Sequence, residues 1–229
     1  MPRPGGGPMS LRAESVTAGW RRGHPVVDDV DLTVEPGGVL GLAGPSGCGK
    51  STLTRVLALL HAPWSGTVTV GGEPVHRYRF GAPAALRRRI GVVFQSPRAS
   101  TDPRLTLDRI VAEPLRAAGT PDPAVTARVD EVADLVGLTP ELRTRHPHEV
   151  SDGQLQRACL ARALAPEPDY LLCDEMTAML DASTTAALVS VVADEVTGRG
   201  LGVLAVSHDE PLLGAWAGEV VRPWSRVRP

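Results

Sequence analysis

Lysine, asparagine and aromatic residues are scarce in this sequence of 229 residues. Lys50 is its one lysine, asparagine is absent, and aromatic residues make up 3% of the chain. Aliphatic side chains must therefore build the core, and the 42% of hydrophobic residues suffice for a sizeable one. The formal net charge of -2 excludes a nucleic-acid binder that depends on bulk charge, so we expect no nucleic-acid partner.

Disulfides, membrane spans and a signal peptide are not expected either. The three cysteines form no CxxC pair, and their odd number argues against a disulfide framework and fits a reducing cytosol. The longest run without charge, residues 56–72, contains Pro63 and Gly66 and cannot span a bilayer. Residues 1–9, MPRPGGGPM, lack the apolar stretch of a signal peptide and are interpreted as a flexible leader. These observations predict a soluble intracellular protein.

Two kinds of pattern alternate along the chain and predict an α/β fold. Short apolar runs rich in β-branched residues predict strands, and longer amphipathic runs predict helices. Between about 97 and 165, Ala, Arg and Leu recur at helical spacing, which indicates a helical lobe inserted into the sheet domain. Because strands and helices alternate on both sides of this lobe, we expect a parallel sheet covered by helices. The expected strands are 39–43, 67–70, 90–94, 170–173 and 202–206, with shorter strand-like pieces within 11–34, and the expected helices are 50–60 and 183–196.

The strongest local signal is a glycine-rich loop between the expected strand 39–43 and the expected helix 50–60. It fits GxxxxGK[ST], the pattern of a phosphate-binding loop. Glycines let the backbone turn its N–H groups inward, and the helix N-terminus adds positive partial charge for a nucleotide phosphate. Lys50 is expected to reach the β- and γ-phosphates, and the Ser51 hydroxyl to bind Mg²⁺. The candidate nucleotide-binding residues of this loop are Gly44, Pro45, Ser46, Gly47, Cys48, Gly49, Lys50, Ser51 and Thr52.

A second signal is the apolar run from Tyr170 that ends in Asp174 and Glu175. Any strand can end in two acidic residues, so the motif alone is weak. Downstream of a phosphate loop it gains meaning, because the carboxyl ends of parallel strands are where such sheets bind ligands. Asp174 is then expected to hold Mg²⁺ through water, and Glu175 to polarise the water that attacks the nucleotide.

Residues 151–154, Ser-Asp-Gly-Gln, precede a good helical pattern. Taken alone, Ser151 and Asp152 mark a helix start, with Gly153 inside the first turn. Their place between the phosphate loop and Asp174 gives the segment a second interpretation.

The order of motifs resembles the ATP-binding cassette of ABC transporters, over about residues 10–222. VSDGQ takes the place of the family's LSGGQ signature. Trp20 falls where the family places an aromatic residue that stacks on adenine, although a lone Trp before a turn also serves for packing. The remaining matches are Gln95 in GVVFQ with the Q-loop, Asp181 in AMLD with the D-loop, and His208 in AVSHD with the switch histidine.

The resemblance implies a P-loop NTPase (RecA-like) core with an antiparallel β subdomain and an inserted α-helical subdomain at about 97–165, within one cassette of residues 10–225. It also implies ATP and Mg²⁺ as ligands, with a catalytic group of Glu175, His208 and Gln95 and a metal group of Ser51, Gln95 and Asp174. Two cassettes would pair head to tail, so that Ser151, Gly153, Gln154 and Asp181 face the partner's nucleotide. Two transmembrane permease subunits and, indirectly, an extracytoplasmic solute-binding protein would complete the assembly at the cytoplasmic face of the cell membrane.

A narrower resemblance concerns the solute. VVFQSPRASTDPRLTLDRIVAEPL and HPHEVSDGQLQR are similar to cassettes of the dipeptide, oligopeptide and nickel importer group. That group commonly pairs two different cassette chains, with a homodimer as the alternative. The chain ends soon after its last expected strand, which is closer to the nickel-type members, so peptides and nickel or metal chelates both stay open. A soluble non-transport ABC ATPase and a cassette that binds ATP without hydrolysing it stay open as well.

Two departures from the family pattern bear on the signature. Asp152 replaces the first Gly of LSGGQ, and AMLD, with Met179, replaces the usual SALD. A carboxylate ~5 Å from a phosphate charge would cost roughly 3 kcal/mol at an effective dielectric constant of ~20. In that case the site that uses this signature hydrolyses slowly, and the dimer is functionally asymmetric. Alternatively, the Asp152 side chain points to solvent and only favours the start of the helix.

Three further features are given structural interpretations. The run Arg87-Arg88-Arg89 predicts a solvated face, with phosphate or RNA binding as the alternative. His146 and His148 beside Glu149 lack a further ligand at metal-site spacing. Cys48 is interpreted as a small filler residue, with a redox-sensitive thiol as the alternative.

Overall fold

The computed structural model describes residues 10–178 and 180–226, and its strands form two sheets. The proposed leader 1–9 and Met179 lie outside the described residues. One sheet is antiparallel, in the order β2-β1-β4-β5, and comprises β1 (Leu11–Ala18), β2 (Val27–Val34), β4 (Ser65–Val70) and β5 (Glu73–Pro74). The other is parallel, in the order β6-β7-β8-β3-β9, and comprises β3 (Val39–Ala43), β6 (Ile90–Val93), β7 (Tyr170–Asp174), β8 (Gly202–Ser207) and β9 (Glu219–Val221).

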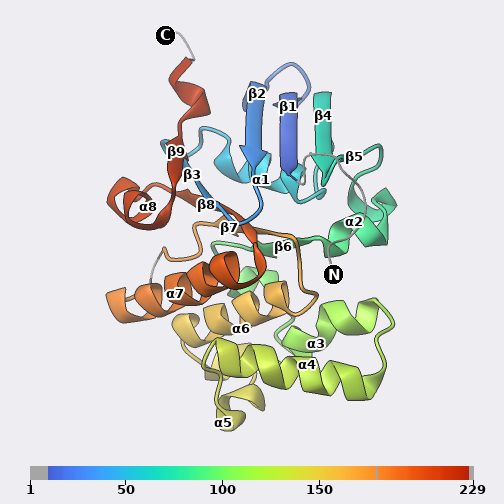
Figure 1. Cartoon of the computed structure of the whole chain (residues 1–229), viewed down its shortest axis with the longest axis vertical. Coiled ribbons are helices and arrows are strands. Elements are labelled where there is room, and N and C mark those ends of the chain that lie inside the picture. The colour runs from blue at the N-terminus through green and yellow to red at the C-terminus, as the bar shows by residue number, and fades with distance from the viewer. Residues whose placement is uncertain (1–9, 179, 227–229) are drawn as a thin grey trace.

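Helices lie between the two sheets and below the parallel one (Figure 1). The helix predicted over 50–60 ends three residues early, because Leu59 has a φ of 61°, outside the helical region. The α-helices are α1 (Lys50–Leu57), α2 (Ala84–Arg88), α3 (Leu107–Ala117), α4 (Asp122–Leu135), α5 (Pro140–Arg143), α6 (Asp152–Leu164), α7 (Ala182–Arg199) and α8 (Glu210–Trp216). The 3-10 helices are η1 (Arg79–Gly81), η2 (Arg98–Ser100), η3 (Pro147–Glu149) and η4 (Pro223–Arg226).

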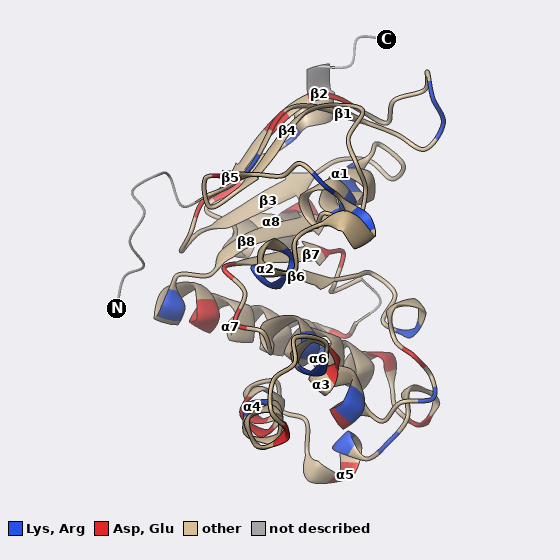
Figure 2. Ribbon diagram, turned by 90° about the vertical axis from the view of Figure 1, so that its right-hand side faces the viewer, with Lys and Arg blue, Asp and Glu red and all other residues tan. Residues whose placement is uncertain are grey.

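The parallel sheet separates two apolar clusters. Every residue of β7 and β8 is buried, as expected for parallel strands covered on both faces. On one face, α1 packs between the parallel and the antiparallel sheet through Leu53, Val56 and Leu57. On the other face, α3, α4, α6 and α7 pack together and against the sheet. Figure 2 shows β3 and β8 free of charged residues, whereas strands of the antiparallel sheet carry some.

The predicted fold class is confirmed: a P-loop α/β core carries an antiparallel sheet and a helical insertion. The helices α3 to α6 occur between β6 and β7 and lie at the end of the molecule opposite the antiparallel sheet (Figure 1). Within residues 10–178 and 180–226, no helix combines the length and apolar character that crossing a membrane requires.

Candidate functional site

The glycine-rich loop joins β3 to α1, and its backbone needs glycine at two positions. Gly47 and Gly49 have φ values of 81° and 109°, a region that residues with a Cβ rarely adopt. At Gly49 a Cβ would also lie 2.2 Å from the carbonyl oxygen of Val26, whereas at Gly47 it would meet open space. Gly49 therefore allows Val26, the residue before β2, to approach the loop closely.

Lys50 is buried and turns back over its own loop. Its Nζ donates to the carbonyl oxygens of Gly44, at 2.7 Å, and Pro45, at 2.9 Å. The first turn of α1 contains no acidic residue and has no side-chain cap, so its N–H groups and its dipole remain available to an anion. The loop thus gathers an ammonium group and a helix N-terminus, which is the donor set that a phosphate requires.

Asp174 lies at the end of β7, close to the start of α1. Its side chain is 4% exposed, and its Oδ1 accepts a hydrogen bond of 3.1 Å from the Ser51 hydroxyl. Burial raises the pKa of Asp174 above its ordinary value, and the Ser51 hydrogen bond opposes this shift. A hydroxyl and a carboxylate beside a phosphate loop are hard oxygen donors that suit Mg²⁺.

Glu175 is held between two side chains that come from neighbouring strands. Gln95 Nε2 donates to Glu175 Oε2 at 2.8 Å, and His208 Nδ1 lies 3.4 Å from Glu175 Oε1. Gln95 follows β6, Glu175 follows β7 and His208 follows β8, and these three strands are adjacent in the sheet. The parallel order therefore brings the three predicted catalytic residues together at the carboxyl edge. Glu175 is 13% exposed and has a φ of 52°, a left-handed backbone that is costly for a residue with a Cβ.

A cavity of about 350 Å³ connects these groups. Its lining includes six of the nine predicted phosphate-loop residues, together with Trp20 and the predicted base. Three predicted loop residues do not line the cavity. The carbonyl oxygens of Gly44 and Pro45 accept hydrogen bonds from the Lys50 ammonium. The Cys48 sulfur packs against Gly44, where it would lie 2.9 Å from an added Cβ. The cavity is lined by Trp20, Val26, Ser46, Gly47, Gly49, Lys50, Ser51, Thr52, Gln95 and Glu175.

Trp20 lines this cavity and is 63% exposed. Its Nε1 donates to Thr52 Oγ1 at 3.1 Å, and its ring centroid lies 4.5 Å from that of His61. The guanidinium carbon of Arg55 lies 5.6 Å from the same ring centroid, within the range of a cation–π contact. The sequence predicted Trp20 but neither of the residues that contact its ring. Arg55 lies on α1, and His61 lies in the loop that follows α1.

The signature residues lie elsewhere, at the N-termini of α6 and α7. Ser151 caps α6 in a reciprocal pair with Gln154: Gln154 N donates to Ser151 Oγ at 3.2 Å, and Ser151 N donates to Gln154 Oε1 at 2.9 Å. Asp181 caps α7 by accepting from Thr184 N at 2.9 Å, and hydrogen bonds from Ser183 and Thr184 hold the pKa of Asp181 well below its ordinary value. A Cβ on Gly153 would lie 3.2 Å from Thr184 Cγ2, so the two helix starts are in close contact. Ser151, Gly153, Gln154 and Asp181 thus gather with one another, and none of them lines the phosphate-loop cavity.

Asp152 has a partner that neither expectation from the sequence included. Its Oδ1 lies 2.7 Å from Arg98 Nε, with the two side chains 52% and 47% exposed. Arg98 follows Gln95 by three residues. The one sequence signal for this ion pair is the acidic residue at position 152, where the family pattern has Gly.

Comparison with known protein families identifies the family of the chain. The family model described as ABC transporter matches residues 27–178, a span that contains the phosphate loop, the signature and Asp174. The chain belongs to the ABC transporter family. Its described residues form an ABC ATPase domain.

Curated relatives of this ABC ATPase domain are longer than the chain itself. A Brucella abortus protein named as a putative peptide import ATP-binding protein is 40% identical over 235 residues, covering 98% of this chain and 66% of the relative. The oligopeptide transport ATP-binding protein OppD of Mycobacterium tuberculosis is 43% identical over 183 residues, covering 80% of this chain and 30% of OppD. The glutathione import ATP-binding protein GsiA of Shigella dysenteriae is 39% identical over 202 residues, covering 88% of this chain and 32% of GsiA.

Solved structures give the same fold. The dimeric, post-hydrolysis structure of the ATP-binding cassette MJ0796 with ADP and Pi matches with a TM-score of 0.79 and 27% identity, covering 93% of this chain and 97% of that one. The structure of cbiO1 from Clostridium perfringens matches with a TM-score of 0.79 and 24% identity, covering 94% of this chain and 89% of that one, and supports the fold alone.

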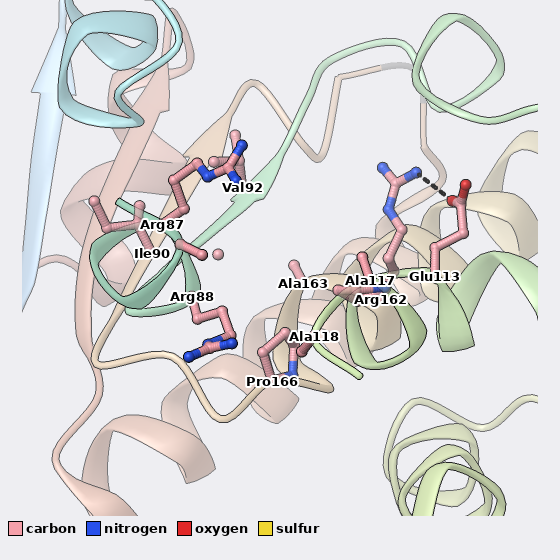
Figure 3. A pocket seen from close by; sticks show the side chains of 13 residues that line it. Arg87, Arg88, Ile90, Val92, Glu113, Ala117, Ala118, Arg162, Ala163 and Pro166 are labelled. Atoms are coloured by element: carbon pink, nitrogen blue, oxygen red, sulfur yellow. Dashed lines mark ion pairs between the residues drawn. The ribbon is translucent and has the colours of Figure 1, made fainter. Parts of the chain in front are cut away.

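The ABC ATPase domain has a second, larger cavity of about 550 Å³, at the junction of α2, β6, α3 and α6. Figure 3 shows Arg87 and Arg88 of α2 on one side and Ala117, Ala163 and Pro166 on the other. Arg162 forms an ion pair of 3.8 Å with Glu113 at its edge. Arg89, the third residue of the arginine run, instead pairs with Asp169 and donates to the carbonyl oxygen of Val70.

His146, His148 and Glu149, which precede the signature, form a capping arrangement at the start of η3. His146 N donates to Glu149 Oε2 at 2.7 Å, and the rings of His146 and His148 stack with centroids 5.7 Å apart. Hydrogen bonds from His146 lower the pKa of Glu149. Across the part of the chain that the structure describes, His, Cys, Asp and Glu side chains form no group of three or more suited to a metal ion.

Proposed function

We propose that this chain binds and hydrolyses Mg·ATP as the ATP-binding subunit of a peptide importer. The observation that carries the proposal is the position of Glu175, between Gln95 and His208 at the edge of the phosphate-loop cavity. A carboxylate there can accept a proton from a water that approaches a bound γ-phosphate.

The site fits the ligands that the proposal requires. Lys50 supplies the cation, and the first turn of α1 supplies N–H donors. Ser51 and Asp174 would hold Mg²⁺, which neutralises phosphate charge when it is bound. Trp20, which lines the cavity and is largely exposed, would stack on the base.

The catalytic work of this chain is then positioning and charge stabilisation, as in phosphoryl transfer generally. Glu175 takes the proton from water, Gln95 orients the Glu175 carboxylate and the water, and His208 stabilises charge on the γ-phosphate side. Lys50 balances negative charge on the transferred group. His208 and Gln95 also link the state of the γ-phosphate to the two strands that carry them.

A second cassette is proposed to complete the site. Because Ser151, Gly153, Gln154 and Asp181 do not line the chain's own cavity, they are free to face the nucleotide of a partner cassette in a head-to-tail pair. The dimeric arrangement named for the MJ0796 structure supports this assembly. A partner of different sequence is the proposed case, and a homodimer is the alternative. Light-scattering mass measurement of the Glu175→Gln chain with Mg·ATP separates the two, because only self-pairing gives an ATP-dependent dimer of the chain alone.

Transport requires contact with two permease subunits at the cytoplasmic face of the membrane, and with a solute-binding protein only indirectly. We place the permease contact at the cavity between α2, β6, α3 and α6, because it joins the core to the helical segment of about 97–165 and is rimmed by Arg87, Arg88 and Arg162. Peptides are the proposed solute because several relatives are named for peptide, oligopeptide or glutathione import.

Uptake into membrane vesicles that contain the whole transporter tests this function. ATP-dependent uptake of a labelled peptide, competed by unlabelled dipeptides and not by Ni²⁺, is the expected result. Competition by Ni²⁺ alone would favour a metal-chelate importer. Recovery of the chain only in the soluble fraction, with its permeases present in the membrane, would refute the transport proposal and favour a non-transport ABC ATPase.

A further inference from the structure

The signature of this chain carries a negative charge where a phosphate is expected to bind. Asp152 is the first residue of α6, directly after the capping Ser151. A carboxylate at that position stabilises the helix start, but it also opposes an anion that approaches the same N-terminus. The signature can therefore work on a partner's nucleotide only if this charge is balanced.

Arg98 supplies that balance through three contacts with one stretch of chain. Its Nε lies 2.7 Å from Asp152 Oδ1, while its Nη1 donates to the Pro147 carbonyl at 2.7 Å and its Nη2 donates to the Val150 carbonyl at 3.0 Å. A surface ion pair alone contributes little, because solvent screens it and two long side chains must be ordered. Here the guanidinium plane is fixed by two backbone acceptors before it meets the carboxylate, so little additional entropy is lost on pairing.

We propose that Arg98 is a positioning residue that neutralises Asp152 and holds the signature turn against the segment that follows Gln95. The inference rests on the proposed ATP hydrolysis at a two-cassette site. It makes Arg98 and Asp152 a matched pair: the acidic signature works because a cation from the Q-loop segment accompanies it.

Further contacts show why this pair connects two sites rather than stabilising one turn. Arg162, in the second half of α6, donates to the carbonyl oxygen of Ser100 at 2.6 Å, so the segment after Gln95 is held to α6 at two points. Gln156, also on α6 and buried, donates to the carbonyls of Phe94 at 3.3 Å and Met176 at 2.9 Å. Phe94 precedes Gln95, and Met176 follows Glu175. Helix α6, which begins at the signature, is thus hydrogen-bonded to the backbone next to Gln95 and next to Glu175.

The test uses four variants of the transporter complex, purified through a tag on this chain. Arg98→Ala leaves Asp152 unbalanced and is expected to lower kcat for ATP about 10- to 100-fold, with KM for ATP changed less than about threefold. Asp152→Gly removes the charge and is expected to keep at least wild-type kcat. The double variant is expected to recover to within about threefold of Asp152→Gly, because the repulsive charge is gone. Arg98→Lys keeps the charge and loses the fork geometry, so an intermediate kcat is expected.

A matched control separates charge balance from general damage. Arg104→Ala removes another arginine from the same segment, one that pairs with Asp102 at 2.8 Å, and is expected to leave kcat unchanged. Thermal unfolding checks that every variant is folded. A purely structural Arg98 would lower the melting temperature without recovery of kcat on adding Asp152→Gly.

The outcomes separate failure of this inference from failure of the proposed function. A wild-type complex that hydrolyses ATP at the same kcat as Arg98→Ala overturns the role of Arg98 and leaves the ATPase proposal standing. Loss of kcat in Arg98→Ala that Asp152→Gly does not restore also overturns it. A wild-type complex that binds ATP and never releases phosphate refutes the ATPase proposal, and the inference falls with it.

Discussion

Gln95 Nε2 donates a hydrogen bond of 2.8 Å to Glu175 Oε2, although 80 residues separate the two in sequence. The whole helical segment lies between them in the chain. They meet because β6 and β7 are parallel neighbours, paired from Ile90 with Tyr170 to Val93 with Cys173. The carboxyl ends of both strands therefore lie at one edge of the sheet, beside the phosphate loop that follows β3.

Loss of the Gln95 amide should impair turnover more than binding. Gln95→Ala removes the donor that orients the Glu175 carboxylate, and we expect kcat to fall about 10- to 100-fold with little change in KM. Steady-state phosphate release measures both constants. An unchanged kcat would show that Gln95 does not position Glu175.

Gly49 and Gly47 form a matched pair for the phosphate loop. Both have a positive φ, but only at Gly49 would a Cβ meet a backbone atom, the Val26 carbonyl oxygen at 2.2 Å. We expect Gly47→Ala to lower the free energy of unfolding by about 1 kcal/mol, the cost of a left-handed backbone. Gly49→Ala should cost about 3–5 kcal/mol, because the Val26 backbone must move, and should abolish ATP binding. Chemical denaturation compares them, and equal losses would contradict the close approach of Val26.

Asp174 should reduce the stability of the nucleotide-free protein. Its pKa is raised in the folded state, chiefly by burial, so the folded protein holds the proton more tightly than the unfolded chain. The free energy of unfolding therefore falls as pH rises from the ordinary carboxyl pKa towards the raised native pKa. Asp174→Asn removes this cost, and above about pH 4 its melting temperature should exceed that of the wild type increasingly until Asp174 is fully ionised.

A carboxylate in an ion pair provides the control for that prediction. Asp169 pairs with Arg89 near the start of β7, so Asp169→Asn should lower the melting temperature at neutral pH. Each kcal/mol of stability corresponds to roughly 2–4 °C for a domain of this size. If Asp174→Asn melts below the wild type at neutral pH, burial does not dominate at this position.

Much of this architecture could be predicted from the sequence, and the reasons are local. The run from Tyr170 is apolar because β7 is covered on both faces, and the loop from Gly44 to Ser51 includes glycine at the two positions, Gly47 and Gly49, where its backbone has a positive φ. The end of α1 was missed because nothing in the local pattern marks the positive φ of Leu59. Arg98 was missed because its partners, Asp152 and the Pro147 and Val150 carbonyls, lie about 50 residues away and are brought near only by the packing of the helical segment.

Trp20 provides a prediction about the base of the nucleotide. Its ring is held by Thr52 and by contact with His61, yet it stays largely exposed, as a stacking surface must. We expect Trp20→Ala to weaken ATP binding about 10-fold, the usual effect of losing an aromatic ring beneath a base, and Trp20→Phe to retain most of the affinity. Equilibrium binding of a fluorescent ATP analogue measures this. Equal affinity of Trp20→Ala and wild type would assign the ring a packing role.

The most direct test compares phosphate release by the wild-type complex and by Glu175→Gln, with ATP binding measured on the same samples. We predict that both bind Mg·ATP with similar affinity and that Glu175→Gln releases phosphate at least about 100-fold more slowly, because the amide cannot accept the proton from water. Hydrolysis by Glu175→Gln at the wild-type rate would contradict the assignment of Glu175 as the base at the phosphate loop.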